Sequence, residues 1–301
     1  MQPTSNPARG GDHRNATGAR LRSRTFTSMG TVVSLAIPCE PGPASHPVEE
    51  ELEAATAVVE RLFNELDETF SLYRPDSEAS AMARGELALS EASAQMRELY
   101  RSASEWRIST EGAFTAERPD GVVDLAGIVK AHAILKAGTS LRALGLRDWC
   151  INAGGDVLVE GSPIHGGVQP WLAGVVDPED RGALLTAFPL GRGGLGRGGG
   201  LGGGGEAGGR EAAAPKQALA TSGTSERGQH IWSAGRPVRG PGSFRQVSVA
   251  APDIITADVL ATAIMAGGAK TLSLATGHWD VEVLAVKNDG GLLATPGFRA
   301  R

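Results

Sequence analysis

Two short segments, far apart in the chain, carry residues whose types and spacing suit metal and phosphate chemistry. The first runs from Val123 to Lys130 and places the carboxylate of Asp124 six residues before the lysine. The second contains Asp258 and Thr262, which are four residues apart and therefore share one face of a helix. Carboxylate, hydroxyl and backbone carbonyl oxygens suit Mg²⁺. The two segments together predict a site for Mg²⁺ and a phosphate group.

Each of these residues also has an ordinary structural interpretation. Asp124 precedes a predicted helix and fits an N-cap, while Lys130 fits a solvated helical lysine. Asp258 fits an acidic residue near a helix N-terminus, where the helix dipole favours it, and Thr262 fits a mid-helix threonine. Gly127 lacks such an ordinary interpretation, because glycine in a helix costs about 1 kcal/mol of stability relative to alanine. It indicates that another group approaches the backbone closely.

Two further segments offer polar groups at the ends of predicted strands. The segment 152–156 (Asn-Ala-Gly-Gly-Asp) has a carboxamide and unshielded backbone amides, and the segment 220–223 (Ala-Thr-Ser-Gly) has two hydroxyls. Such turns can contact a phosphate or the edge of a ring. For the first segment a plain β-bulge is an equal alternative.

The elements that position these residues indicate an α+β fold, with largely antiparallel sheets and a few long helices. Hydrophobic spacing predicts helices at residues 48–70, from 90 to about 111, from 125 to 144 and from about 256. Runs rich in β-branched residues and turn signals predict strands at residues 30–37, 149–159, 171–176, 183–190, 217–220, 244–250, 281–286 and 292–294.

The ends and the middle of the chain set the domain boundaries. Residues 1–24 contain several arginines but no apolar run, so they predict a disordered lead-in rather than a secretory signal. Residues 191–209 are mostly glycine and match GxGxxG without the strand and helix that a dinucleotide-binding loop requires. The chain therefore reads as one domain, 25–301, with a flexible glycine-rich insertion at 191–209.

Composition excludes several classes of protein. The 301 residues have a formal net charge of −5, which argues against general nucleic-acid binding. Cys39 and Cys150 form no CxxC pair, so neither a zinc site nor a disulfide framework is expected. No apolar run reaches the roughly 20 residues that span a bilayer, so no transmembrane segment is expected. The cytoplasm is the expected location.

Seven segments occur in an order and spacing that resemble the ApbE family of FAD:protein FMN transferases. The resemblance covers about residues 25–290 apart from the glycine tract. The segments are 29–31, 71–75, 112–114, 124–130, 151–156, 220–223 and 257–262.

The resemblance implies a Mg²⁺-dependent enzyme that cleaves the pyrophosphate of FAD. It would transfer FMN to a threonine of an acceptor flavoprotein and release AMP. In-line attack on phosphorus needs a divalent cation to neutralise developing charge. By resemblance, the catalytic residues are Asp258, Thr262 and His230, and the metal ligands are Asp258, Thr262 and the carbonyl of Gly127. The FAD-binding residues implied in the same way are Met29, Tyr73, Ala113, Phe114, Thr115, Asp124, Lys130 and Ile231.

The chain departs from the family pattern at two acidic positions. Thr115 stands where the family has an aspartate after Ala113-Phe114. After His230-Ile231 the family has an Asp-Pro pair, where this chain has Ser233-Ala234 in a shortened loop. His230 alone also fits a polar residue at a strand end. Two alternative functions therefore remain: an FAD pyrophosphatase that gives FMN and AMP, and a non-catalytic FAD-binding relative.

Overall fold

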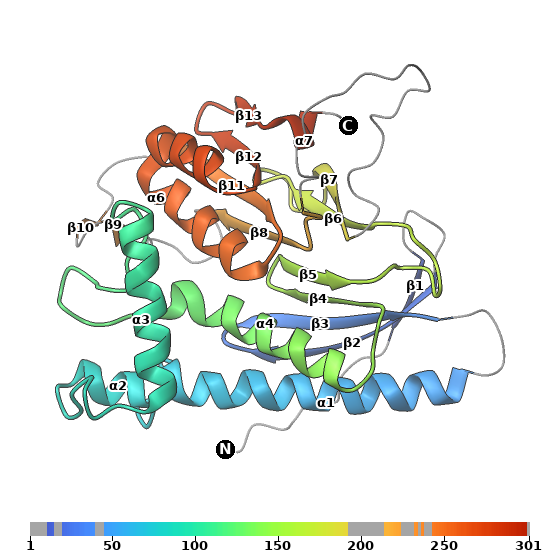
Figure 1. Ribbon diagram of the computed structural model, residues 1–301, viewed down its shortest axis with the longest axis horizontal. Coiled ribbons are helices and arrows are strands. Elements are labelled where there is room, and N and C mark those ends of the chain that lie inside the picture. The colour runs from blue at the N-terminus through green and yellow to red at the C-terminus, as the bar shows by residue number, and fades with distance from the viewer. Residues whose placement is uncertain are drawn as a thin grey trace, which may run out of the picture.

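A nine-stranded sheet forms the centre of the molecule, and every neighbouring pair of its strands is antiparallel (Figure 1). The computed structural model describes residues 11–14, 20–39, 45–191, 214–223, 232–233, 236–237 and 243–299. In spatial order the strands of the sheet are β1 (Gly11–Arg14), β2 (Arg20–Ser28), β3 (Thr31–Pro38), β4 (Trp149–Ala153), β5 (Asp156–Glu160), β8 (Ala218–Gly223), β11 (Phe244–Ala251), β12 (Glu282–Lys287) and β13 (Leu292–Ala294).

Two smaller pairs complete the strands, and six helices are described. The pairs are β6 (Trp171–Val176) with β7 (Leu184–Leu190), and β9 (Trp232–Ser233) with β10 (Arg236–Pro237). The helices are α1 (Ser45–Phe70), α2 (Glu78–Ala83), α3 (Ala94–Ser109), α4 (Ala126–Ala143), α6 (Ile254–His278) and α7 (Pro296–Arg299). The predicted α+β class with largely antiparallel sheets is confirmed.

The sheet buries apolar side chains on both faces. Helices α1, α4 and α6 cover one face, where residues such as Leu35, Phe63 and Ile134 form the main core (Figure 1). On the other face, the β6–β7 hairpin packs with Val157, Val159 and Leu219 of β5 and β8, and α7 packs on β12 and β13. There Phe188 and Phe298 pack with ring centroids 4.7 Å apart. Alternation along the strands therefore decides which residues face the helices.

Helix α6 contains the predicted metal segment with Asp258 and Thr262. Its N-cap is Asp253, whose side chain accepts a hydrogen bond from the backbone amide of Thr256 at 2.9 Å. By length and composition alone α6 is apolar enough to cross a membrane, but it packs on β8, β11 and α4. Core helices pass the same test, so α6 is weak evidence for a span.

Two expectations need correction. Residues 11–14 and 20–24 were expected to belong to a disordered lead-in, but they form β1 and the start of β2, paired residue by residue with their neighbours. The strand expected at 149–159, with an interruption at Gly154-Gly155, is a hairpin in which a turn at these two glycines joins β4 to β5. Most of the glycine-rich tract, from residue 192 onwards, lies outside the described residues.

Candidate functional site

The two segments predicted to do chemistry meet where the central strands β5 and β8 begin and end. Lys130 lies in the second turn of α4, and Thr262 lies in the third turn of α6. Between them stand the first residue of β5 and the last residues of β8. A continuous series of polar contacts, described below, connects the two helices across these strand ends.

Asp156, the first residue of β5, forms the centre of this series. Its Oδ2 lies 2.5 Å from Nζ of Lys130, and its Oδ1 accepts a hydrogen bond from the backbone amide of Thr221 at 3.1 Å. The Asp156 side chain is fully buried, and that of Lys130 is 12% exposed. Thr221 also bonds sideways to β11, with its hydroxyl 2.8 Å from that of Ser248.

The series continues into α6 through the next residue of β8. The hydroxyl of Ser222 lies 3.1 Å from the hydroxyl of Thr262. Asp258 is one helical turn before Thr262 on the same face, and it is 6% exposed. Because α6 begins at Ile254 and is capped by Asp253, Asp258 lies in the second turn, near the helix N-terminus as the structural interpretation expects. Asp258 also lies inside the packed part of the helix.

Segment 113–115 lies between α4 and α6. A Cβ atom added at Gly127 would stand 3.2 Å from Cε2 of Phe114, and one added at Gly267 of α6 would stand 3.1 Å from Cβ of Ala113. The group that approaches Gly127 closely is therefore the ring of Phe114. The structure brings Ala113, Phe114 and Gly127 together beside the two helices that carry Lys130 and Thr262.

Asp124 and Thr115 both hold nearby backbone amides. Oδ1 of Asp124 accepts a hydrogen bond from the amide of Ala126 at 3.0 Å, whereas the N-cap residue of α4 is Leu125, which makes no side-chain cap bond. The N-cap alternative for Asp124 is therefore wrong by one residue. Thr115 Oγ1 accepts from the amide of Glu117 at 3.1 Å. The threonine that replaces the family's aspartate thus still supplies a buried oxygen acceptor.

Met29 occupies a strained turn next to the turn at Gly154-Gly155. Met29 and Gly30 join β2 to β3 with φ angles of 50° and 70°, as in a two-residue hairpin turn. A positive φ costs a residue with a side chain roughly 1–2 kcal/mol. A Cβ atom at Gly154 would lie 2.5 Å from Oγ1 of Thr31, so the two turns are in contact. Their contact indicates why position 154 is glycine.

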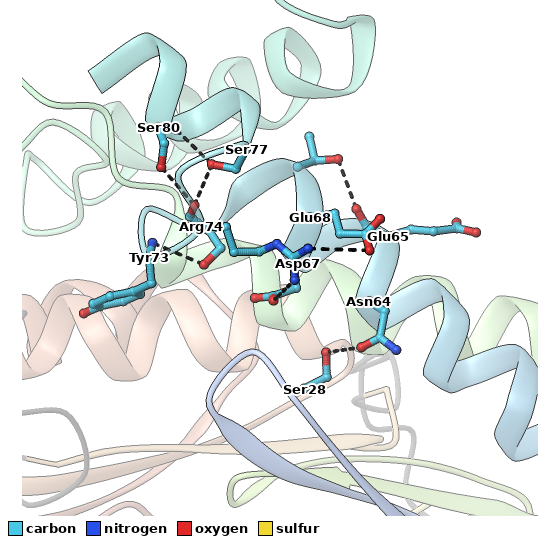
Figure 2. A network of polar contacts seen from close by, with 11 residues as sticks. Ser28, Asn64, Glu65, Asp67, Glu68, Tyr73, Arg74, Ser77 and Ser80 are labelled. Carbon is cyan, nitrogen blue, oxygen red and sulfur yellow. Dashed lines mark hydrogen bonds and ion pairs between the residues drawn. The ribbon is translucent and has the colours of Figure 1, made fainter. Parts of the chain in front are cut away.

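The loop of Tyr73 is fixed by its backbone, while its ring is in solvent. Figure 2 shows the Tyr73 amide bonded to Oγ of Ser71 at 3.3 Å and the Arg74 guanidinium between Asp67 and Glu68, 3.7 Å from each. Burial raises the pKa of Asp67, and the charge of Arg74 opposes this. The Tyr73 side chain is 86% exposed. This predicted FAD-binding residue is therefore exposed, whereas Ala113 and Phe114 are buried.

Comparison with known proteins identifies the family. The model of the ApbE family matches residues 29–118 and 115–285. The chain belongs to the ApbE family. The FAD:protein FMN transferase of Rhodobacter capsulatus is 31% identical over 197 residues, covering 62% of this chain and 32% of that relative. The chain thus matches about a third of the length of this curated relative.

Solved structures show that the ApbE fold extends over almost the whole chain. The flavin transferase ApbE from Vibrio cholerae has a TM-score of 0.68 at 21% identity, covering 94% of this chain and 99% of that one. The ApbE protein from Thermotoga maritima has a TM-score of 0.66 at 18% identity, covering 92% and 98%. At these identities the likeness establishes the fold alone.

Two predicted site residues of this ApbE-family chain, His230 and Ile231, lie outside the described residues. Ser233 lies in the short strand β9. Within the described ranges, no group of three or more His, Cys, Asp or Glu side chains could hold a metal ion. The predicted magnesium ligands have a single carboxylate, that of Asp258, so they would not form such a group. The magnesium site stays a prediction.

Sequence reasoning did not single out Asp156 or Ser222, which the structure places at the centre of the site. The signal for Asp156 was present, because a carboxylate directly before the apolar run 157–159 has a high cost of burial unless it is paired. Its partner could not be identified, because Lys130 is 26 residues earlier and on a helix. Ser222 stood inside a highlighted segment, but its contact with Thr262 depends on the packing of α6 on β8.

Proposed function

We propose that this chain is a Mg²⁺-dependent FAD:protein FMN transferase. In the reaction, the hydroxyl oxygen of an acceptor threonine bonds to the phosphorus of the FMN half of FAD. The bond from that phosphorus to the bridging oxygen breaks, AMP leaves with that oxygen, and the threonine proton is released. The products are AMP and a flavoprotein that carries FMN on its threonine.

One observation carries the proposal: the polar series from Lys130 through Asp156, Thr221 and Ser222 to Thr262. At the ends of β5 and β8, these contacts connect the segment of Lys130 with the segment of Thr262, the two segments predicted to bind phosphate and Mg²⁺. Membership of the ApbE family supports the proposal, and so does the activity that the name of the Rhodobacter capsulatus relative states.

The predicted ligands offer the oxygen atoms that a magnesium ion prefers. Asp258 supplies a buried carboxylate, Thr262 a hydroxyl one turn further on the same helical face, and Gly127 a backbone carbonyl. When bound, Mg²⁺ neutralises charge that develops on the pyrophosphate. Lys130 adds a positive charge near the same phosphates. Phe114 and Ala113 hold the start of α4 in place beside α6.

The deciding experiment incubates the purified protein with FAD and Mg²⁺, with and without a threonine-bearing acceptor flavoprotein. Chromatography measures AMP and FMN, and mass spectrometry measures the acceptor. We expect AMP together with an acceptor heavier by one FMN, and no reaction in EDTA. An acceptor with valine in place of the threonine should gain no mass.

The same experiment separates the alternatives. AMP with free FMN and an unmodified acceptor would establish an FAD pyrophosphatase. Bound FAD that remains intact would establish a flavin-binding relative without catalysis. Either result overturns the proposed transfer.

A matched pair of variants tests the proposed metal ligands. Thr262→Val removes the hydroxyl beside Ser222, whereas Thr276→Val removes a hydroxyl near the other end of α6 that bonds only to backbone carbonyls. We expect Thr262→Val to raise the Mg²⁺ concentration needed for half-maximal AMP release, and Thr276→Val to leave it unchanged. Equal Mg²⁺ requirements in both variants would remove Thr262 from the ligand set.

A further inference from the structure

The ion pair between Asp156 and Lys130 is buried at the proposed reaction site. The two charged atoms lie 2.5 Å apart, on a fully buried aspartate and a lysine that is 12% exposed. Burying such a pair carries a large desolvation cost, and apolar replacements are often equally stable. Stability alone therefore does not account for this pair.

The carboxylate of Asp156 connects two separate elements. Oδ2 contacts the ammonium of Lys130 on α4, and Oδ1 accepts from the amide of Thr221 on β8. The residue after Thr221 is Ser222, which bonds to Thr262 on α6. The position of the ammonium is therefore fixed relative to the strand end that contacts the proposed metal ligands.

We propose that Asp156 is a positioning residue for Lys130. It holds the ammonium at the end of β8, where the diphosphate of the dinucleotide substrate binds. This inference rests on the proposed function. A lysine is a point charge on a flexible four-carbon stem, so a fixed partner is needed to aim it. A charge that is oriented before the substrate arrives stabilises the transition state without reorganisation.

Asp156→Asn tests this proposal with little change of shape. The amide oxygen still accepts from Thr221, but the negative charge opposite Lys130 is lost. Misplacing a group by about 1 Å can cost about 100-fold in rate. We expect kcat to fall by about that factor while KM for FAD changes little, the pattern of an interaction that matters in the transition state.

A double-mutant cycle distinguishes positioning from a separate role. The chains compared are the wild type, Asp156→Asn, Lys130→Met and the double variant, each measured for kcat, KM and FAD affinity. If Asp156 acts through Lys130, the double variant should be no slower than Lys130→Met alone. Losses that multiply in the double variant would overturn the proposal.

A control variant comes from the other end of strand β8. Asp280 pairs with the buried Lys216, with Oδ1 and Nζ 2.5 Å apart, where the chain enters β8. Asp280→Asn removes the carboxylate of an ion pair in which the lysine is buried and the aspartate is half exposed, and Lys216 keeps its bond to the Asp280 carbonyl. This variant should leave kcat and FAD affinity unchanged. An equal loss of kcat in Asp280→Asn would mean that any broken ion pair suffices, and would refute positioning.

Two further outcomes are covered by the same set of chains. If Asp156→Asn does not fold, Lys130→Met is compared with the double variant, because the double variant leaves neither charge buried alone. A lower kcat in the double variant than in Lys130→Met refutes the proposal. If the wild type releases no AMP, the proposed function fails, and FAD binding becomes the measurement. A loss of FAD affinity in Asp156→Asn that adds to the loss in Lys130→Met when the two are combined then overturns the inference, and a double variant that binds FAD no more weakly than Lys130→Met supports it.

Discussion

Replacing Gly138 with alanine tests how closely α4 must lie against the sheet. A Cβ atom at this position would stand 2.8 Å from Cη2 of Trp149 and 3.1 Å from Cδ2 of Leu158. Both side chains are buried, so neither has free space to move into. Alanine gains about 1 kcal/mol of helix propensity, while overpacking a core costs about 1–3 kcal/mol. We expect Gly138→Ala to lower the free energy of unfolding by up to about 2 kcal/mol.

The control is another helical glycine with open space around it. A Cβ atom at Gly277, near the end of α6, would meet nothing within 4 Å. Gly277→Ala should therefore raise stability by up to about 1 kcal/mol. Urea unfolding followed by circular dichroism gives both values, with equal slopes expected for the two variants. If Gly138→Ala raises the urea midpoint as much as Gly277→Ala does, the close seating of α4 on Trp149 is refuted.

Three further outcomes are expected. Asp258→Ala should abolish Mg²⁺-dependent release of AMP, and full retention of that activity would exclude Asp258 as a ligand. Burial raises the pKa of the Cys150 thiol to about 12 from 9.0, so its contribution to stability is present below pH 9 and is lost as pH rises toward 12. A maleimide at pH 8 should label Cys150 more slowly in the folded protein than in urea, and equal labelling rates by mass mapping would contradict this. Burial, assisted by Lys136, lowers the pKa of His132 below 6.5, so stability is lost as pH falls below that value. His132→Gln should flatten the pH dependence of unfolding between about pH 7 and 5, whereas a slope equal to that of the wild type would exclude His132 as its source.

Elements with a clear local period were predictable from the sequence, and elements held by distant partners were not. The apolar spacing in α1 and the turn residues after β6 and β12 carry their own signals, and the structure confirms these elements. Strand β2 was missed entirely, because Arg22 and Arg24 make its first half look solvated. Arg24 in fact pairs with Glu49 and Glu53 of α1, at 3.1 and 3.0 Å. Those partners are 25 and 29 residues away, beyond any local pattern.

In the candidate site, too, some features follow from local spacing and others depend on distant partners. The shared face of Asp258 and Thr262 follows from helical spacing, which is a local property. The pairing of Lys130 with Asp156 and of Ser222 with Thr262 depends on how α4 and α6 pack on the sheet. The sequence analysis therefore identified both helical segments of the site but not the strand residues that connect them. A buried charge before an apolar strand is the kind of signal that would have identified Asp156.

Gly127 shows how a packing constraint and a proposed chemical role share one position. The ring of Phe114 lies where a Cβ atom of residue 127 would crowd it, at 3.2 Å, so a small residue is needed for packing alone. Ala113, next to that ring, lies equally close to Gly267 of α6. A larger residue at Gly127 would press on the Phe114 ring, whereas one at Gly267 would meet Thr271 of its own helix as well as Ala113. Residues 113 and 114 therefore contact both α4, which carries Gly127, and α6, which carries Asp258.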